Sequence, residues 1–166
     1  MSFKIIDNFL PKKYFCDVKN KLESEKFNWF YQNKLTYPDK NWEKFWFAHC
    51  FYENNLVTSP YYNLMHDTLI HLKAHATIRI RANLNVNLSE KYFADWHIDT
   101  DSANSKTAIL YINNNNGYTE LKNDNRIEKI NCVENRIVIF DHFHEHRMAS
   151  QTDTDRRIVV NFNYYG

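Results

Sequence analysis

The stretch "TIRIRANLNVNL", from Thr77 to Leu88, alternates apolar and polar residues without a break. Successive side chains of a β-strand point to opposite faces, so this alternation predicts a strand with one apolar and one polar side. The expected apolar side carries Ile78, Ile80, Ala82, Leu84, Val86 and Leu88, and the expected polar side carries Arg79, Arg81, Asn83, Asn85 and Asn87. A period of two therefore places this part of the chain in a sheet.

Four further segments after this strand are rich in β-branched and aromatic residues. They are "TAILYIN" from Thr107, "RIEKINCV" from Arg126, "NRIVIF" from Asn135 and "RRIVVNFNYY" from Arg156. Turn residues separate them at short intervals, and "NNNNG" at 113–117 is the clearest turn. This arrangement predicts an antiparallel sandwich or barrel with helices packed outside.

The residues before these strands are expected to be helical and irregular. Apolar residues at helical spacing predict a helix in the segment that begins at Pro11, "PKKYFCDVKNKLESEKF". A capping serine, Ser59, followed by a proline at the first helical position, predicts a second helix in "SPYYNLMHDTLIHLKAHA". The aromatic segment 28–52 has no clean period and is expected to form loop and short strand over the core, or part of a pocket wall.

Length and charge set limits on the class of protein. We expect the 166 residues to form a single domain, with a helical N-terminal part at about 1–76 and a β core at about 77–166. With 21 basic and 20 acidic side chains, the chain gives no reason to expect nucleic acid or a membrane surface as a partner. Its three cysteines lie far apart, and the charged N-terminus does not suit a signal peptide, so we expect a cytoplasmic protein.

Two histidine-containing stretches carry the candidate chemistry. In "FADWHIDT", His97 and Asp99 stand two residues apart, so in extended backbone both side chains leave the same face and can hold one ion. In "FDHFHEHRM", His142, His144 and His146 alternate, and the spacing alone does not say which of them binds metal. Two histidines and one carboxylate form the facial triad of iron(II) oxygenases, which leaves coordination positions open.

The order of these motifs resembles a known family. The segment from about Thr77 to Tyr164 is similar to the catalytic core of the iron(II)- and 2-oxoglutarate-dependent oxygenases, in particular the prolyl 4-hydroxylase-like branch. The matching stretches are "HID" at 97–99, "AILYIN" at 108–113, "ENRIVIFD" at 134–141, a histidine shortly afterwards and "RRIVVNFNY" at 156–164, with "IIDNFLPKKYF" at 5–15 as a further likeness. The resemblance implies a mainly β fold with flanking helices, built on a cupin-like double-stranded β-helix, or jelly roll.

The resemblance also implies which histidine completes the site. In the family's pattern the second histidine precedes the anchoring arginine by roughly ten residues, and His146 precedes Arg156 by ten and Arg157 by eleven. His97, Asp99 and His146 are therefore the expected metal ligands and catalytic residues. His144 is the alternative third ligand, and otherwise His142 and His144 are expected at the surface or beside a ligand.

The cofactors implied by the resemblance are Fe(II), 2-oxoglutarate as cosubstrate, and dioxygen. Arg157 is expected to hold the far carboxylate of 2-oxoglutarate, with Arg156 as the alternative, because a guanidinium donates two parallel hydrogen bonds. Tyr111 is expected to donate its hydroxyl to the same carboxylate. Asn83 is counted with these cosubstrate-binding residues, and Arg81 is expected to point into the pocket with it.

The implied activity couples decarboxylation of 2-oxoglutarate to succinate with hydroxylation of a C–H bond, in a prolyl residue or a small molecule. The aromatic segment 29–52 and the acidic loop 99–105 are expected to shape the mouth for this primary substrate, which the sequence does not identify. Two other functions stay open: a metal-binding cupin-like enzyme that does not use 2-oxoglutarate, and a non-catalytic jelly-roll binding module.

Overall fold

The computed structural model describes residues 3–33, 44–123 and 126–166. In chain order its elements are β1 (Lys4–Ile6), α1 (Lys12–Leu22), β2 (Phe30–Gln32), β3 (Trp46–Glu53), β4 (Leu56–Val57), the 3-10 helix η1 (Tyr62–Met65), α2 (His66–Leu72), β5 (Ala76–Val86), β6 (Lys106–Tyr111), β7 (Tyr118–Asn123), β8 (Arg126–Asn131), β9 (Ile137–Asp141), β10 (His146–Ala149) and β11 (Arg156–Tyr165). None of the helices in these ranges is long and apolar enough to cross a membrane.

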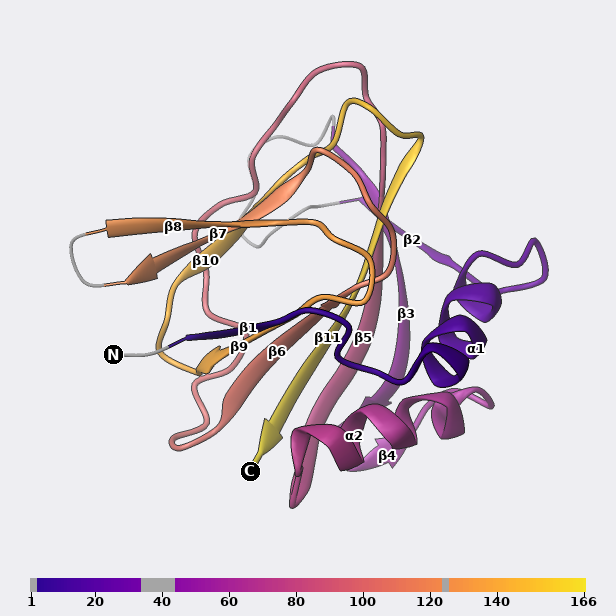
Figure 1. Ribbon diagram of the computed structural model, residues 1–166, viewed down its shortest axis with the longest axis vertical. Helices are drawn as coiled ribbons and strands as arrows, with labels where there is room; N and C mark the ends of the chain where they lie inside the picture. The colour runs from indigo at the N-terminus through magenta and orange to yellow at the C-terminus, as the bar shows by residue number, and fades with distance from the viewer. Residues whose placement is uncertain (1–2, 34–43, 124–125) are drawn as a thin grey trace.

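The strands form two antiparallel sheets that face each other. The larger sheet has the order β1-β9-β6-β11-β5-β3-β2, with β4 paired to β3, and the smaller one has the order β10-β7-β8. Isolated bridges from Phe93 to Ala149 and from His97 to His146 bring the loop after β5 alongside β10. Helices α1 and α2 lie together on the outer side of the larger sheet (Figure 1). The predicted antiparallel sandwich with external helices is confirmed.

Both faces of the larger sheet are covered along β6, β9 and β11, which explains why apolar residues occupy both sides of these strands. In β11, Ile158, Val160 and Phe162 belong to the core cluster that includes helix residues such as Phe15 of α1. Val159, which points the opposite way, belongs to the cluster between the two sheets. The polar side of β5 also faces the space between the sheets, so it does not face bulk solvent as an isolated amphipathic strand would.

The N-terminal part contains more β structure than expected. Besides α1 it supplies β1 to β4, and β3 pairs with β5 along the larger sheet. Strand β3 is buried on both faces, and its aromatic composition therefore shows no alternating period. Of the aromatic segment predicted as loop and short strand, residues 34–43 lie outside the described ranges.

The second predicted helix is shorter than expected. The hydroxyl of Ser59 accepts the backbone N–H of Tyr61, but it also contacts the ring of the buried His49 at 2.7 Å. The chain continues through η1, and the α-helix begins only at His66. Met65, Thr68 and Leu72 of this segment are buried. Ser59 therefore caps neither η1 nor α2 by a side-chain hydrogen bond.

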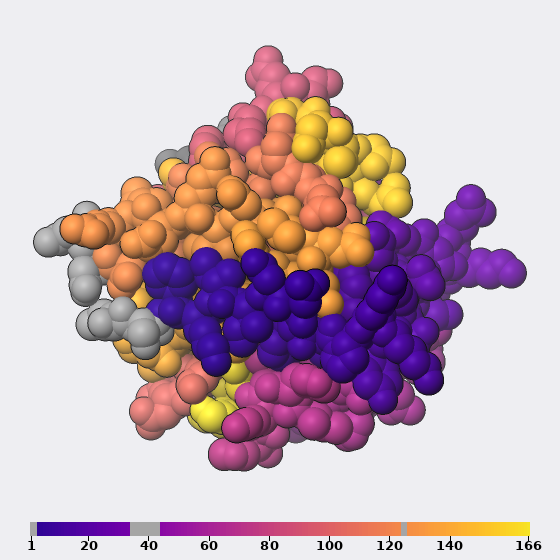
Figure 2. Space-filling model, in the orientation of Figure 1, coloured from indigo at the N-terminus to yellow at the C-terminus, as the bar shows by residue number. Residues whose placement is uncertain are grey.

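Asparagine takes over backbone conformations that glycine often supplies. Five of the seven described non-glycine residues with positive φ are asparagines, whereas neither glycine has a positive φ. Asn135, with φ of 58°, is also buried, and its amide group exchanges two hydrogen bonds of 3.0 and 2.8 Å with the backbone of Leu10. This contact attaches the segment before α1 to the start of β9, where the N-terminal chain crosses the face seen in Figure 2.

Replacing Asn135 with alanine is therefore expected to lower the free energy of unfolding by about 3 kcal/mol, because it removes two buried hydrogen bonds and forces alanine into a left-handed conformation. Denaturant titration followed by circular dichroism measures the change. Asn135→Gly is the matched control. Glycine adopts the positive φ without strain but also lacks the two hydrogen bonds, so its decrease in the free energy of unfolding should be smaller. Equal stability of wild type and Asn135→Ala would contradict this account.

Candidate functional site

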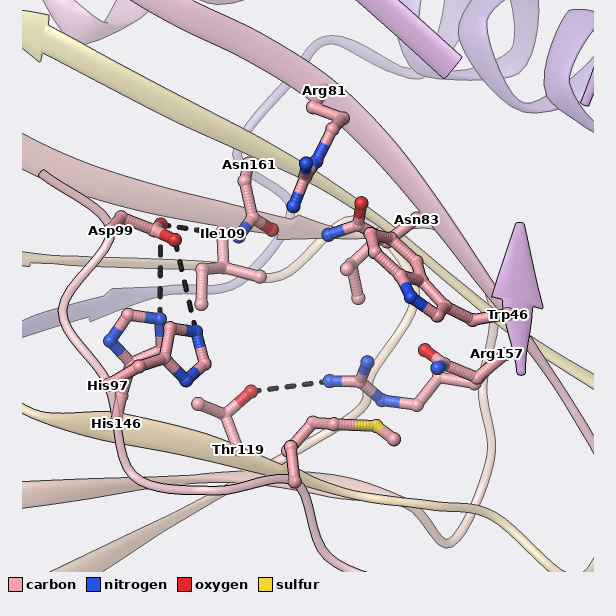
Figure 3. Close-up of a pocket in the computed structure, with 14 residues that line it drawn as sticks. Trp46, Arg81, Asn83, His97, Asp99, Ile109, Thr119, His146, Arg157 and Asn161 are labelled. Carbon is pink, nitrogen blue, oxygen red and sulfur yellow. Dashed lines mark hydrogen bonds and ion pairs between the residues drawn. The ribbon is translucent and has the colours of Figure 1, made fainter. Parts of the chain in front are cut away.

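A cavity opens between the two sheets, and the polar side of β5 forms one of its walls (Figure 3). Its volume is about 560 Å³ including space open to solvent, which is within the range of about 300–1,000 Å³ for small-molecule sites. The lining residues are Trp46, Arg81, Asn83, Asn85, Ala94, His97, Asp99, Ile109, Thr119, His146, Met148, Arg157, Val159 and Asn161. Most of the residues predicted from the sequence to act together are in this set.

Three side chains of kinds that can hold a metal ion meet at one end of the cavity. His97 and Asp99 come from the loop after β5, and His146 begins β10, which that loop bridges. The Nε2 atoms of His97 and His146 lie 3.9 and 3.8 Å from the two carboxylate oxygens of Asp99. The three potential ligand atoms all lie within 4.8 Å of one another. They are close enough to converge on a single ion.

The hydrogen bonds of the two imidazoles prepare them as ligands. Nδ1 of His97 contacts the carbonyl of Asp95 at 2.9 Å, and Nδ1 of His146 contacts the carbonyl of His144 at 3.4 Å. Because a carbonyl only accepts, each Nδ1 carries the proton and each Nε2 keeps a lone pair. Nε2 of His146 is buried without a partner among the described residues. Two imidazole nitrogens and one carboxylate oxygen together form a donor set that suits a divalent metal.

Electrostatics keep the three side chains ready to bind a cation. Burial lowers the pKa of His146 to about 4, against the attraction of Asp99, so the imidazole is neutral at pH 7. Burial alone would raise the pKa of Asp99, but His146, Arg79, His97 and a hydrogen bond from Asn163 outweigh it and hold the pKa at about 2. The carboxylate is therefore charged and the imidazole uncharged at neutral pH, as metal binding requires.

Asp99 is held by partners that the sequence patterns did not single out. Its side chain is 5% exposed, and it accepts hydrogen bonds from Arg79 at 3.2 Å, Asn161 at 3.3 Å and Asn163 at 3.2 Å. Arg79 of β5 lies directly opposite Asn163 of β11 and donates to its side chain as well. The available signal was the alternation of polar residues within the apolar strand β11, at Arg157, Asn161 and Asn163.

Arg157 lies across the cavity from the three ligands and is buried, with 2% of its surface exposed. Its guanidinium donates to the sulfur of Cys132 at 3.1 Å and to the hydroxyl of Thr119 at 3.3 Å. No carboxylate pairs with it within the described ranges. Arg156, the alternative in the sequence, points to the surface and pairs with Glu23 and Asp155. Arg157 is thus the arginine that reaches the cavity.

Tyr111 lies behind the cavity wall instead of in it. The side chain is fully buried, and its hydroxyl bonds to the hydroxyl of Thr119 at 2.8 Å. Thr119 of β7, which the sequence analysis did not consider, is the lining residue. Since its oxygen accepts from Arg157 and from Tyr111, the hydroxyl hydrogen of Thr119 is left to donate toward the cavity. The tyrosine hydroxyl therefore acts through Thr119.

The remaining histidines of the cluster do not share a face with His146. His142 and His144 belong to the turn before β10, so the chain is not extended there. His144 is buried, contrary to a surface position, and its ring contacts the carbonyl of Lys122 at 3.0 Å and packs edge-on against Phe140. Its backbone carbonyl orients the ring of His146. His146 is the member of the cluster that lies beside His97 and Asp99.

Comparisons with known proteins give the fold. No protein-family model and no curated protein matches the sequence. Among solved structures, a 2OG-Fe(II) oxygenase family oxidoreductase from Burkholderia pseudomallei matches with a TM-score of 0.74 at 9% identity, over 98% of this chain and 84% of that one. The chain has the fold of the 2OG-Fe(II) oxygenases, where 2OG is 2-oxoglutarate. At this identity the likeness establishes the fold alone.

Two other structures with the 2OG-Fe(II) oxygenase fold match over 98% of this chain. A prolyl hydroxylase from Trichoplax adhaerens, in complex with a hypoxia inducible factor peptide fragment, has a TM-score of 0.63 at 16% identity and is covered over 83% of its length. An α-ketoglutarate-dependent non-heme epimerase of nogalamycin biosynthesis has a TM-score of 0.61 at 10% identity and is covered over 76%. The jelly-roll fold implied by the sequence motifs is confirmed.

Proposed function

We propose that this protein is an Fe(II)- and 2-oxoglutarate-dependent oxygenase, similar to the prolyl hydroxylases, that hydroxylates a C–H bond of its primary substrate. The observation that carries this proposal is the meeting of His97, Asp99 and His146 in one cavity with Arg157, a buried cation that has no carboxylate partner among the described residues. The oxygenase fold supports it. The substrate is a peptide or a small molecule, since structures of similar fold include enzymes of both kinds.

Each residue has a distinct part in this proposal. His97 and His146 would offer Nε2 lone pairs and Asp99 a carboxylate oxygen, so that three ligands hold the metal from one side and leave adjacent positions open. Arg157 would bind the far carboxylate of 2-oxoglutarate, assisted by the hydroxyl of Thr119. When bound, the iron and 2-oxoglutarate supply the oxidising chemistry, with succinate and carbon dioxide as products. Ile109 and Val159 keep the cavity partly apolar.

The two rival functions explain less of the cavity. A cupin-like enzyme that does not use 2-oxoglutarate has no need of Arg157, whose charge would then stay buried without a partner at a cost of several kcal/mol. For a binding module without metal, the unpaired Nε2 of His146 and the convergence of the three side chains would be incidental. Both features favour the oxygenase.

Anaerobic titration of the metal-free protein with Fe(II), followed by assay with oxygen and 2-oxoglutarate, tests the proposal. We expect one tightly bound iron per chain, and succinate that forms only when Fe(II) and 2-oxoglutarate are both present. Iron binding without any effect of 2-oxoglutarate would favour the cupin-like enzyme. Absence of specific iron binding would favour the binding module.

Arg79→Gln is expected to weaken Fe(II) binding by about 10- to 100-fold, because partners that orient a metal ligand typically contribute that much. Arg79 also helps to lower the pKa of Asp99, so in Arg79→Gln the carboxylate becomes protonated at a higher pH than in the wild type. The loss of Fe(II) affinity relative to the wild type should therefore grow as the pH falls. Calorimetric titration at two pH values measures this effect. The control is Arg136→Gln, which removes an arginine paired with Asp7 at the surface. Equal affinities for both variants would contradict the role of Arg79.

A further inference from the structure

A second arginine, Arg81, enters the cavity from the wall formed by β5. In Figure 3 its guanidinium points inward between Asn161 and Asn83, on the side opposite Arg157. The register of the larger sheet explains this position, because Arg81 pairs directly with Asn161 of β11. The cavity is therefore flanked by two guanidinium groups, and only one of them is needed to hold 2-oxoglutarate.

No described side chain forms an ion pair with Arg81. Its guanidinium takes part in no ion pair and donates no hydrogen bond within the described ranges, and its Nε is buried without a partner. Burial and the nearby Arg79 lower its pKa, and the more distant attraction of Asp99 and Glu53 does not outweigh them. Arginine nevertheless stays protonated at neutral pH. A half-buried guanidinium that faces the cavity without an ion-pair partner among the described residues favours an anionic ligand there.

Packing fixes the direction in which Arg81 can donate. The guanidinium carbon lies 4.9 Å from the centre of the Trp46 ring, which holds the planar group by a cation–π contact. Its free N–H groups are thus oriented before a ligand arrives. A planar fork held in this way matches the two oxygens of a carboxylate.

A hydrogen-bond acceptor stands beside this donor. The amide nitrogen of Asn161 donates to Asp99, and a carboxylate only accepts, so the orientation of this amide is chemically determined. Its Oδ1 is buried and lacks a partner in the described part of the chain, as does Oδ1 of Asn83 in the same wall. This wall therefore presents the guanidinium of Arg81, which can bind a carboxylate, and the Oδ1 atoms of Asn161 and Asn83, which can accept hydrogen bonds from N–H or O–H groups.

Binding of 2-oxoglutarate would not supply a negative charge for Arg81. Asp99 is the one carboxylate among the described lining residues, and it is already paired with Arg79. The two negative charges of 2-oxoglutarate would be taken up by the iron and by Arg157. Arg81 would still face the cavity as an unpaired cation.

We propose that Arg81 binds a carboxylate of the primary substrate and that Asn161 accepts a hydrogen bond from an N–H or O–H group of the same molecule. The substrate is then a small carboxylic acid that carries a hydrogen-bond donor, such as a free amino acid. This inference rests on the proposed oxygenase function. A residue inside a peptide chain lacks the free carboxylate and would leave Arg81 unpaired.

The experiment is a pair of calorimetric titrations without oxygen, so that no turnover occurs. The first adds 2-oxoglutarate to the Fe(II)-loaded protein, and the second adds the common L-amino acids one by one to the protein saturated with Fe(II) and 2-oxoglutarate. The primary amide of each amino acid that binds is then titrated as a matched ligand that lacks the carboxylate. Both titrations are repeated with Arg81→Gln, Arg81→Lys and the surface control Arg156→Gln.

We expect at least one amino acid to bind, and its amide to bind at least about tenfold more weakly, since a charge-assisted bidentate pair is lost. Arg81→Gln should weaken binding of the amino acid by a similar factor, and Arg81→Lys should restore part of that affinity. Arg156→Gln should bind the amino acid with the affinity of the wild type. Binding of 2-oxoglutarate to Arg81→Gln should stay within about twofold of wild type, which shows that the cavity is intact.

Several results would overturn the proposal. They are the binding of no amino acid, equal binding of acid and amide, equal binding by wild type and Arg81→Gln, and a selective loss of 2-oxoglutarate binding in Arg81→Gln, which would assign Arg81 to the cosubstrate. If the first titration succeeds and the second fails, this inference alone is wrong. If 2-oxoglutarate does not bind the wild type, the proposed function fails and this inference with it.

Discussion

Asp99→Asn is expected to weaken Fe(II) binding by more than about 100-fold and to abolish 2-oxoglutarate turnover, since residues that only orient a ligand already contribute 10- to 100-fold. The substitution keeps the shape of the side chain but removes the one negative charge that faces the imidazoles of His97 and His146. Anaerobic titration with Fe(II) measures the affinity, and succinate formation measures the turnover.

Asp95→Asn is the matched control for this variant. Asp95 lies in the same loop with an exposed side chain, and its contact with His97 is made by the backbone carbonyl, which the substitution retains. Wild-type iron binding is therefore expected for the control. If Asp99→Asn also binds Fe(II) with wild-type affinity, the three side chains do not form the metal site.

Arg157→Gln is expected to raise the dissociation constant for 2-oxoglutarate by roughly 100-fold, because truncating one partner of a buried ion pair costs about 2–5 kcal/mol. Fe(II) affinity should change little, because Arg157 lies across the cavity from the three metal-ligating side chains. Calorimetry of the Fe(II)-loaded protein without oxygen separates the two affinities.

Arg156→Gln removes the same charge from the adjacent position, where the side chain pairs with acidic residues at the surface. Its affinity for 2-oxoglutarate should equal that of the wild type. A thermal melt of Arg157→Gln is needed as well, because the guanidinium also contacts Cys132 and Thr119. A stable Arg157→Gln that binds 2-oxoglutarate normally would show that the cosubstrate uses another anchor.

Much of the site was visible in short patterns. The alternation from Thr77 to Leu88 predicts β5 with its two sides, and the motif order groups His97, Asp99 and His146, which the fold brings together. The alternating histidines were ambiguous because their spacing says nothing about backbone conformation. His142 and His144 lie in a turn, and only His146 enters a strand.

Other features had no local signal. Strand β7, which carries Thr119, is rich in polar residues and was not predicted. Tyr111 was expected to line the cavity, but it lies behind Thr119 and bonds to its hydroxyl. The segment that contains β3 was expected only as loop and short strand, because burial on both faces removes the alternation that identifies a strand. Ser59 does not cap a helix: neither η1 nor α2 has a side-chain hydrogen bond at its N-cap, and Ser59 contacts His49 instead.

Local patterning was sufficient for the strand-rich class of this protein and for the residue types that can hold a metal, because side-chain periodicity is a property of neighbouring residues. Three-dimensional packing was needed to show that the polar side of β5 faces a cavity between the sheets and that β11 places Asn161 beside Arg81 and Asn163 beside Arg79. Those neighbours are about 80 residues apart in the chain, so only strand register and sheet-on-sheet packing bring them into contact.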